Sequence, residues 1–156
     1  MNAPAARPRP NVVVVIADDL GVGDVGCYHP PSKVPTPHID ALAAEGVRFT
    51  DAHAAAAVCT PSRYALLTGA YAWRTRLQRG VIGGYAPSLI EPGTPTLASV
   101  LRAAGYRTLC VGKWHLGMGF SALPGEAIDF ARAPYTDRDL EARIDFTARL
   151  GGGPLG

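Results

Sequence analysis

The sequence has few cysteines, no long apolar run and little net charge, and each shortage excludes a class of protein. Three cysteines among 156 residues are an odd and sparse set, which argues against a scaffold held together by disulfides. No stretch approaches the roughly 18 consecutive apolar residues of a membrane-spanning helix. Lys and Arg number 15 and Asp and Glu 13, so the net charge is only +2, too small for a nucleic-acid-binding footprint. We therefore expect neither a membrane nor a nucleic acid as partner.

The first ten residues also lack the features of a secretion signal. Residues 1–10 are rich in Ala, Pro and Arg, and no apolar segment with a small-residue cleavage site follows them. This composition predicts a flexible N-terminal segment over residues 1–10 and a cytoplasmic location.

Apolar residues, glycine and proline are plentiful. Hydrophobic residues make up 47% of the chain, an ordinary value for a globular protein, so we do not expect wholesale disorder. The 18 glycines and 14 prolines lie largely between apolar segments, a pattern that indicates long loops between short elements.

Apolar runs indicate three strands. An unbroken β-branched run over residues 11–17, a short run over 47–50 and another over 106–111 each have strand character. The first is an unbroken apolar run, as in strands buried on both faces of a parallel sheet, and the last also has the character of a buried strand. On this interpretation Cys110 packs inside the last strand as a small hydrophobic residue.

Helix signals alternate with these runs. A Thr-Pro or Pro start signal stands at Thr36-Pro37, Pro61 and Thr94-Pro95, and a glycine that would end the helix stands at Gly46, Gly69 and Gly105. Strands alternating with helices predict an α/β fold, with a layered, mostly parallel sheet flanked by helices. We expect this domain to span residues 11–120. Residues 121–156 form an irregular or partly helical excursion, in which 137–150 is either a charged surface helix or irregular.

Asp18 and Asp19 follow the first predicted strand directly. Two adjacent carboxylates repel each other unless a cation lies between them or one is protonated. Leu20-Gly21 would let the chain turn so that both face one ion, and oxygen ligands of this kind suit calcium or magnesium. The alternative is a pair of aspartates that caps a helix or a turn.

Cys59 and Arg63 lie at the start of the second predicted helix. Pro61 places Cys59 at the positive end of the helix dipole, where a nucleophile and an anionic substrate both gain from backbone N–H groups. Arg63, four residues later, lies on the same helical face and can bond to what Cys59 carries. The alternative is a buried structural cysteine beside an ordinary helix start.

Lys113 and His115 follow the last predicted strand. In an extended segment, residues two apart project to the same side, and Trp114 projects to the other. A cation and a proton-transfer group aimed at one point suit an oxyanion substrate. The alternative is a solvated lysine beside a packed histidine.

Three motifs in this order resemble the type I sulfatases, the formylglycine-dependent arylsulfatases of the alkaline phosphatase superfamily. C-T-P-S-R at 59–63 with L-L-T-G at 66–69 is similar to the family signature. Residues 11–21 resemble its opening strand and Asp-Asp metal pair, and G-K-W-H-L-G at 112–117 resembles a downstream block. The resemblance covers about residues 10–119 and corresponds to the amino-terminal part of the family.

The resemblance implies an alkaline-phosphatase-like fold and hydrolysis of small-molecule sulfate esters. It implies that a separate formylglycine-generating enzyme oxidises Cys59 to the nucleophile, and that calcium, with magnesium as the alternative, binds to Asp18, Asp19 and residue 59. Arg63 would steady the aldehyde hydrate, Lys113 would hold the sulfate, and His115 would bind the substrate and assist proton transfer. A divalent cation and these basic groups would offset the developing negative charge.

The chain departs from the family pattern after His115. Family members are longer and add an Asp-Asn metal pair and a further Lys and His, which no residue after His115 supplies. We therefore expect a truncated sulfatase. Two alternatives remain open: a phosphonate or phosphate monoester hydrolase of the same superfamily, and a non-catalytic remnant.

Overall fold

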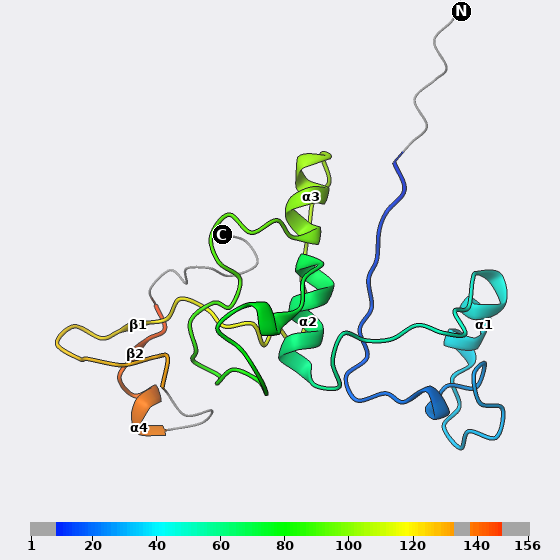
Figure 1. Cartoon of the computed structure of the whole chain (residues 1–156), viewed down its shortest axis with the longest axis horizontal. Helices are drawn as coiled ribbons and strands as arrows, with labels where there is room; N and C mark the ends of the chain where they lie inside the picture. Colours follow the sequence, from blue (N-terminus) through cyan, green and yellow to red (C-terminus); the bar gives the residue numbers. More distant parts are fainter. Residues whose placement is uncertain (1–8, 133–137, 148–156) are drawn as a thin grey trace, which may run out of the picture. The chain divides into compact units, whose positions relative to one another are not determined.

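The computed structural model describes residues 9–132 and 138–147. The chain divides into two compact units, Met1–Asp51 and Ala52–Gly156, which we describe separately (Figure 1). Most of the predicted flexible segment, residues 1–8, lies outside the described residues, and so do residues 133–137 and 148–156 of the predicted excursion. The predicted domain boundary at residue 120 stays a prediction.

The described part of the first unit contains one α-helix, as predicted. It comprises the short 3-10 helix η1 (Val22–Asp24) and α1 (Pro37–Glu45), which starts after Thr36 and ends at Gly46. The Asp40 carboxylate accepts hydrogen bonds from the Cys27 backbone N–H at 2.7 Å and from the Thr36 hydroxyl at 3.0 Å. These bonds tie the loop before α1 to its first turn.

The strands predicted for this unit are not formed in the described structure. Residues 11–17 and 47–50 are in no strand, and Val13 and Val15 are 81% and 86% exposed. Apolar, β-branched residues favour extended backbone, but a strand also needs neighbours that pair with its N–H and C=O groups and cover its faces. The described part of this unit provides no such neighbour.

Two of the predicted helices, those with start signals at Pro61 and Thr94-Pro95, are confirmed in the second unit as α2 (Cys59–Thr68) and α3 (Leu97–Ala103). The described part of this unit also contains the 3-10 helix η2 (Ala72–Arg74) and α4 (Arg138–Glu141). Gly69 ends α2 with φ +68°, a conformation that glycine adopts without a steric cost. The N-cap of α3 is Thr96, slightly later than the Thr94-Pro95 signal. The Thr96 and Ser99 side chains each accept a hydrogen bond from the other residue's backbone N–H, which forms a capping box.

The predicted last strand is also not formed in the described structure. Residues 106–111 form no strand, Leu109 and Val111 are 85% and 86% exposed, and Cys110 is exposed where we expected it to be packed. Within the described residues the sheet is one antiparallel pair, β1 (Ser121–Ala122) and β2 (Ile144–Asp145). The layered parallel sheet is therefore not seen in this part of the chain. The described part of residues 121–156 contains the short helix α4 and both strands, β1 and β2.

The core of the second unit lies against α2, which contacts η2 and α3 (Figure 1). Its buried residues are Tyr64, Ala72, Ile82, Ala86, Leu89 and Leu116. Leu89 and Leu116 are fully buried, and burial of each stabilises the fold by about 1.5–3 kcal/mol relative to exposure. Because Leu116 follows His115 directly, this core also supports the segment that carries the predicted site.

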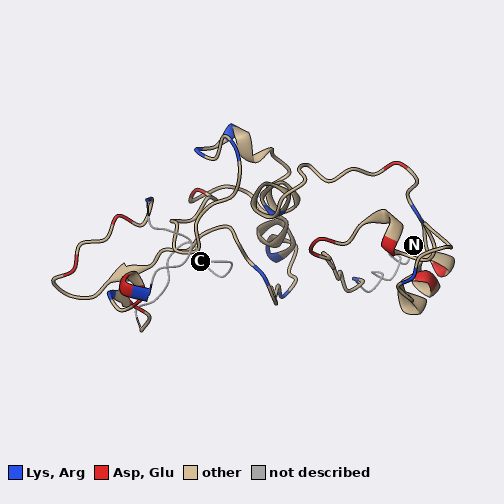
Figure 2. Ribbon diagram, turned by 90° about the horizontal axis from the view of Figure 1, so that it is seen from below, with Lys and Arg blue, Asp and Glu red and all other residues tan. Residues whose placement is uncertain are grey.

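The surface charges are mixed in sign. Figure 2 shows basic and acidic residues interspersed along the ribbon, in keeping with the net charge of +2. None of the described helices has the length and apolar character needed to cross a membrane.

Candidate active site

Cys59 is the first residue of α2. Val58 before it is extended, and the first turn contains no acidic residue that would offset the positive helix end. The Ser62 hydroxyl donates to the Ala56 carbonyl at 2.6 Å, which fastens the preceding loop to the helix. The half-buried Cys59 thiol is thereby held at the end of the helix where an anion is favoured.

Two hydrogen bonds join α2 to residues 113–118, which we call the 113–118 segment. The Thr60 hydroxyl donates to the His115 carbonyl at 3.0 Å, and Arg63 Nη1 donates to the Lys113 carbonyl at 2.6 Å. Thr60 is fully buried. These bonds bring the start of α2 together with residues 50 and 55 positions away along the chain, so two of the three motifs meet in one place. The roles of the individual side chains stay predictions.

His115 has an unusual backbone conformation and a fixed ring. Its φ is +54°, so the segment is not the simple extended strand that we predicted for Lys113 and His115. His115 Nε2 lies 3.1 Å from the Ile82 carbonyl oxygen. A carbonyl only accepts, so in this bond Nε2 carries the proton and, in the neutral ring, the buried Nδ1 is the basic nitrogen.

A small open cavity of about 100 Å³ lies beside His115. Trp114, Met118 and Phe120 line it with apolar side chains, and Gly83 and Gly84 line it without side chains. The cavity therefore provides apolar surface next to a candidate proton-transfer group.

Asp18 and Asp19 belong to the first unit, so this half of the predicted site is described separately from Cys59. The chain bends at both residues and Asp19 has φ +58°, which is the turn that the sequence interpretation required. Among the described residues, Asp19 and His115 are the non-glycine residues with positive φ, and such strain is concentrated at functional sites. No three or more His, Cys, Asp or Glu side chains of the described chain form a metal cluster.

Two residues of this arrangement were missed by the sequence interpretation. Thr60 could have been found from the sequence, because its hydroxyl lies inside the C-T-P-S-R motif and a buried hydroxyl needs a hydrogen-bond acceptor. Ile82 acts through its backbone carbonyl, and its side chain belongs to the core. No residue-type pattern could therefore have identified it.

Removing the Thr60 hydroxyl should destabilise the second unit. In Thr60→Val the part-buried His115 carbonyl loses its donor from the fully buried Thr60, and we expect the free energy of unfolding in urea to fall by about 1–3 kcal/mol. Thr60→Ser, which retains the hydroxyl, is the matched control and should lose less. Equal stability of the valine variant and the unchanged protein would show that this bond contributes nothing.

The comparisons with known proteins agree on one family. The Sulfatase family model matches residues 10–136. The chain is 50% identical over 111 residues to an N-acetylgalactosamine-6-O-sulfatase of Bacteroides thetaiotaomicron, covering 71% of this chain and 21% of that protein. It is 50% identical over 114 residues to human arylsulfatase A (73% and 22%) and 45% identical over 136 residues to mouse steryl-sulfatase (84% and 21%).

A solved structure from work on glycosaminoglycan metabolism by Bacteroides thetaiotaomicron is also similar. It is 50% identical in sequence with a TM-score of 0.67, and the match covers 71% of this chain and 23% of that one. The chain thus spans about a fifth of the length of the curated relatives that it matches. This similarity relates the fold of the chain to that of the alkaline-phosphatase-like sulfatases. The chain belongs to the sulfatase family and corresponds to the amino-terminal part of a type I sulfatase.

Proposed function

We propose that the protein takes part in the hydrolysis of small-molecule sulfate esters, with residue 59 as the nucleophile after oxidation to formylglycine. The observation that carries the proposal is the pair of hydrogen bonds from Thr60 and Arg63 to the 113–118 segment. They join the end of α2 that carries the nucleophile to Lys113 and His115 of the G-K-W-H-L-G motif. We propose, in addition, that the whole protein has the complete α/β sheet of the family.

The chain's own groups would supply most of the charge balance. The N-terminus of α2 and the cations of Arg63 and Lys113 would attract the sulfate and offset the negative charge that grows in the transition state. Nδ1 of His115 would accept or return a proton on the residue 59 hydrate, because Nε2 is held by Ile82.

The donor set fits a hard divalent cation. Asp18 and Asp19 provide adjacent carboxylates on a bend, and such oxygens suit calcium, with magnesium as the second candidate. A bound cation would polarise the sulfate oxygens. Two carboxylates and an oxygen of residue 59 are fewer than the six to eight ligands usual for calcium, so we propose that further ligands come from outside these 156 residues.

The alcohol part of the substrate is left unassigned, because the similar proteins carry names with different alcohols. They include an N-acetylgalactosamine-6-O-sulfatase, an arylsulfatase and a steryl-sulfatase. The macromolecular partner that we propose is the formylglycine-generating enzyme, which would read the C-T-P-S-R signature at 59–63.

Intact-mass spectrometry tests the proposal. After co-expression with a formylglycine-generating enzyme, we expect the chain to be about 18 Da lighter, the difference between a thiol side chain and an aldehyde. The matched control is the double variant Cys27→Ala, Cys110→Ala, in which the loss should persist because Cys59 remains. Unmodified Cys59 under these conditions would contradict the proposal.

Rates on an aryl sulfate and on the corresponding aryl phosphonate test the choice of ester. Both are tetrahedral oxyanions that basic groups can bind, so the motifs do not separate them. We expect faster hydrolysis of the sulfate. A clear preference for the phosphonate would instead favour the phosphonate hydrolase alternative.

A further inference from the structure

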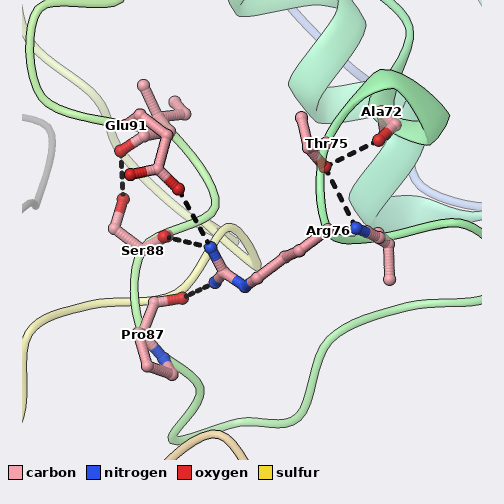
Figure 3. Close-up of polar contacts among 8 residues, drawn as sticks. Ala72, Thr75, Arg76, Pro87, Ser88 and Glu91 are labelled. Carbon is pink, nitrogen blue, oxygen red and sulfur yellow. Dashed lines mark hydrogen bonds and ion pairs between the residues drawn. The ribbon is translucent and has the colours of Figure 1, made fainter.

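Arg76 binds the backbone of a neighbouring loop, residues 86–91, which we call the 86–91 loop. Its Nη2 donates to the Pro87 carbonyl at 2.5 Å and its Nη1 donates to the Ser88 carbonyl at 2.9 Å (Figure 3). Glu91 Oε1 lies 3.5 Å from Nη1. One guanidinium therefore holds two consecutive carbonyls in a fork that a lysine cannot reproduce.

The backbone that carries Arg76 is itself braced. The Thr75 hydroxyl donates to the Ala72 carbonyl at 2.7 Å and accepts from the Leu77 N–H at 3.1 Å, and Figure 3 shows the first of these bonds beside Arg76. Ala72 is buried in the core. The guanidinium thus extends from an anchored turn.

The carbonyl bonds matter more than the ion pair. The side chains of Arg76 and Glu91 are 43% and 70% exposed, and an exposed pair of this kind contributes little. Charged donors to neutral carbonyls make stronger bonds than neutral donors do. We therefore attribute the stabilising effect of Arg76 to its hydrogen bonds with the Pro87 and Ser88 carbonyls.

The 86–91 loop in turn holds the 113–118 segment. The Leu89 N–H donates to the Leu116 carbonyl at 2.8 Å, and the Met118 N–H donates to the Ala86 carbonyl at 3.1 Å. Between them, Gly117 lies so close that a Cβ there would be 2.2 Å from the Pro87 carbonyl oxygen. Residues Leu116–Met118 are thus bracketed by the loop that Arg76 binds.

We propose that Arg76 is a positioning residue for His115, acting through the 86–91 loop; this rests on the proposed function of His115. His115 directly precedes the bracketed residues, and its positive φ needs surroundings that hold it. Its Nε2 meets the carbonyl of Ile82, four residues before Ala86 in the same connection. Displacement of the loop would move both the backbone of His115 and the acceptor that selects its tautomer.

Nuclear magnetic resonance of the unmodified chain tests this inference without requiring hydrolysis. In Arg76→Met we expect exchange of the Leu89 and Met118 amide hydrogens to rise about tenfold. We also expect the ¹⁵N shifts of the His115 ring to move from the Nε2–H tautomer toward an average of the two. Arg76→Lys should give an intermediate result, because an ammonium reaches one carbonyl at a time.

Two control variants isolate the guanidinium's contacts. Arg79→Met makes the same substitution at an exposed position with no hydrogen bond or ion pair in the described structure, and Glu91→Gln removes only the ion pair. Both should keep the His115 ring shifts and the two amide exchange rates of the unchanged protein. A shift in either control as large as in Arg76→Met would overturn the proposal.

A merely structural role for Arg76 would give a different result. Faster exchange at Leu89 and Met118 with unchanged His115 ring shifts would show that Arg76 only braces its loop, and would overturn the proposal. If Arg76→Met does not fold, Arg76→Lys decides, since ring shifts identical to those of the unchanged protein would reject it. Failure of Cys59 conversion would reject the proposed function while leaving these spectra interpretable.

Discussion

Replacing Cys59 with alanine is expected to lower sulfate ester hydrolysis by at least about 10⁴-fold, as removal of the nucleophile does in enzymes that use one. Alanine leaves the helix end and the bonds of Thr60 and Arg63 to the 113–118 segment in place. The anion site would persist while the group that attacks sulfur is lost. The measurement is the initial rate on an aryl sulfate, after co-expression with the maturing enzyme.

Cys110→Ala is the matched control for this loss. Cys110 is exposed and lies outside the proposed machinery, so the variant should keep the rate of the unchanged protein. Unfolding curves of both variants check that the folds are intact. A Cys59→Ala variant that retains activity within tenfold of the control would place the nucleophile elsewhere and remove the basis of the proposed mechanism.

Replacing Gly117 with alanine should destabilise the protein more than any other glycine-to-alanine substitution at this site. The new Cβ would lie 2.2 Å from the Pro87 carbonyl oxygen and 2.7 Å from that of Ala86, both of them backbone atoms. Gly117 also has φ +76°, where alanine costs roughly 1–2 kcal/mol. Overpacking adds about 1–3 kcal/mol, so we expect about 2–5 kcal/mol less stability in urea denaturation.

Gly80→Ala separates the two causes. Gly80 has φ +72°, and nothing lies within 4 Å of a Cβ built there, so this variant bears the backbone cost without the collision. We expect it to lose only about 1–2 kcal/mol. If Gly117→Ala and Gly80→Ala were equally stable, the close approach between the 113–118 segment and the 86–91 loop would not exist in solution.

The helices could be predicted from residue types because their signals are local. Pro37 with Gly46, and Pro61 with Gly69, mark the start and end of α1 and α2 within a residue or two. A proline's restricted φ and a glycine's access to positive φ act on the turn that contains them. Such signals do not depend on which distant segment later packs against the helix.

The strands could not be predicted in the same way. Residues 11–17 and 106–111 have strong strand composition, yet the first run is exposed, the second is largely exposed, and neither forms a strand in the described structure. Composition indicates that a segment suits a pleated, buried surface, whereas pairing requires a partner supplied by other residues. The described residues provide only the short pair β1 and β2.

By itself, the sequence determined the family, the ends of the main helices and the chemical groups available to the site. Only the tertiary structure decided that Thr60 binds the His115 carbonyl, that Ile82 selects the ring tautomer, and that the 86–91 loop encloses Gly117. Motifs and caps depend on neighbouring residues in the chain, so they can be read locally. Hydrogen bonds between backbone groups dozens of residues apart have no residue-type signature, because every residue carries a carbonyl, and only the fold decides which carbonyl a donor meets.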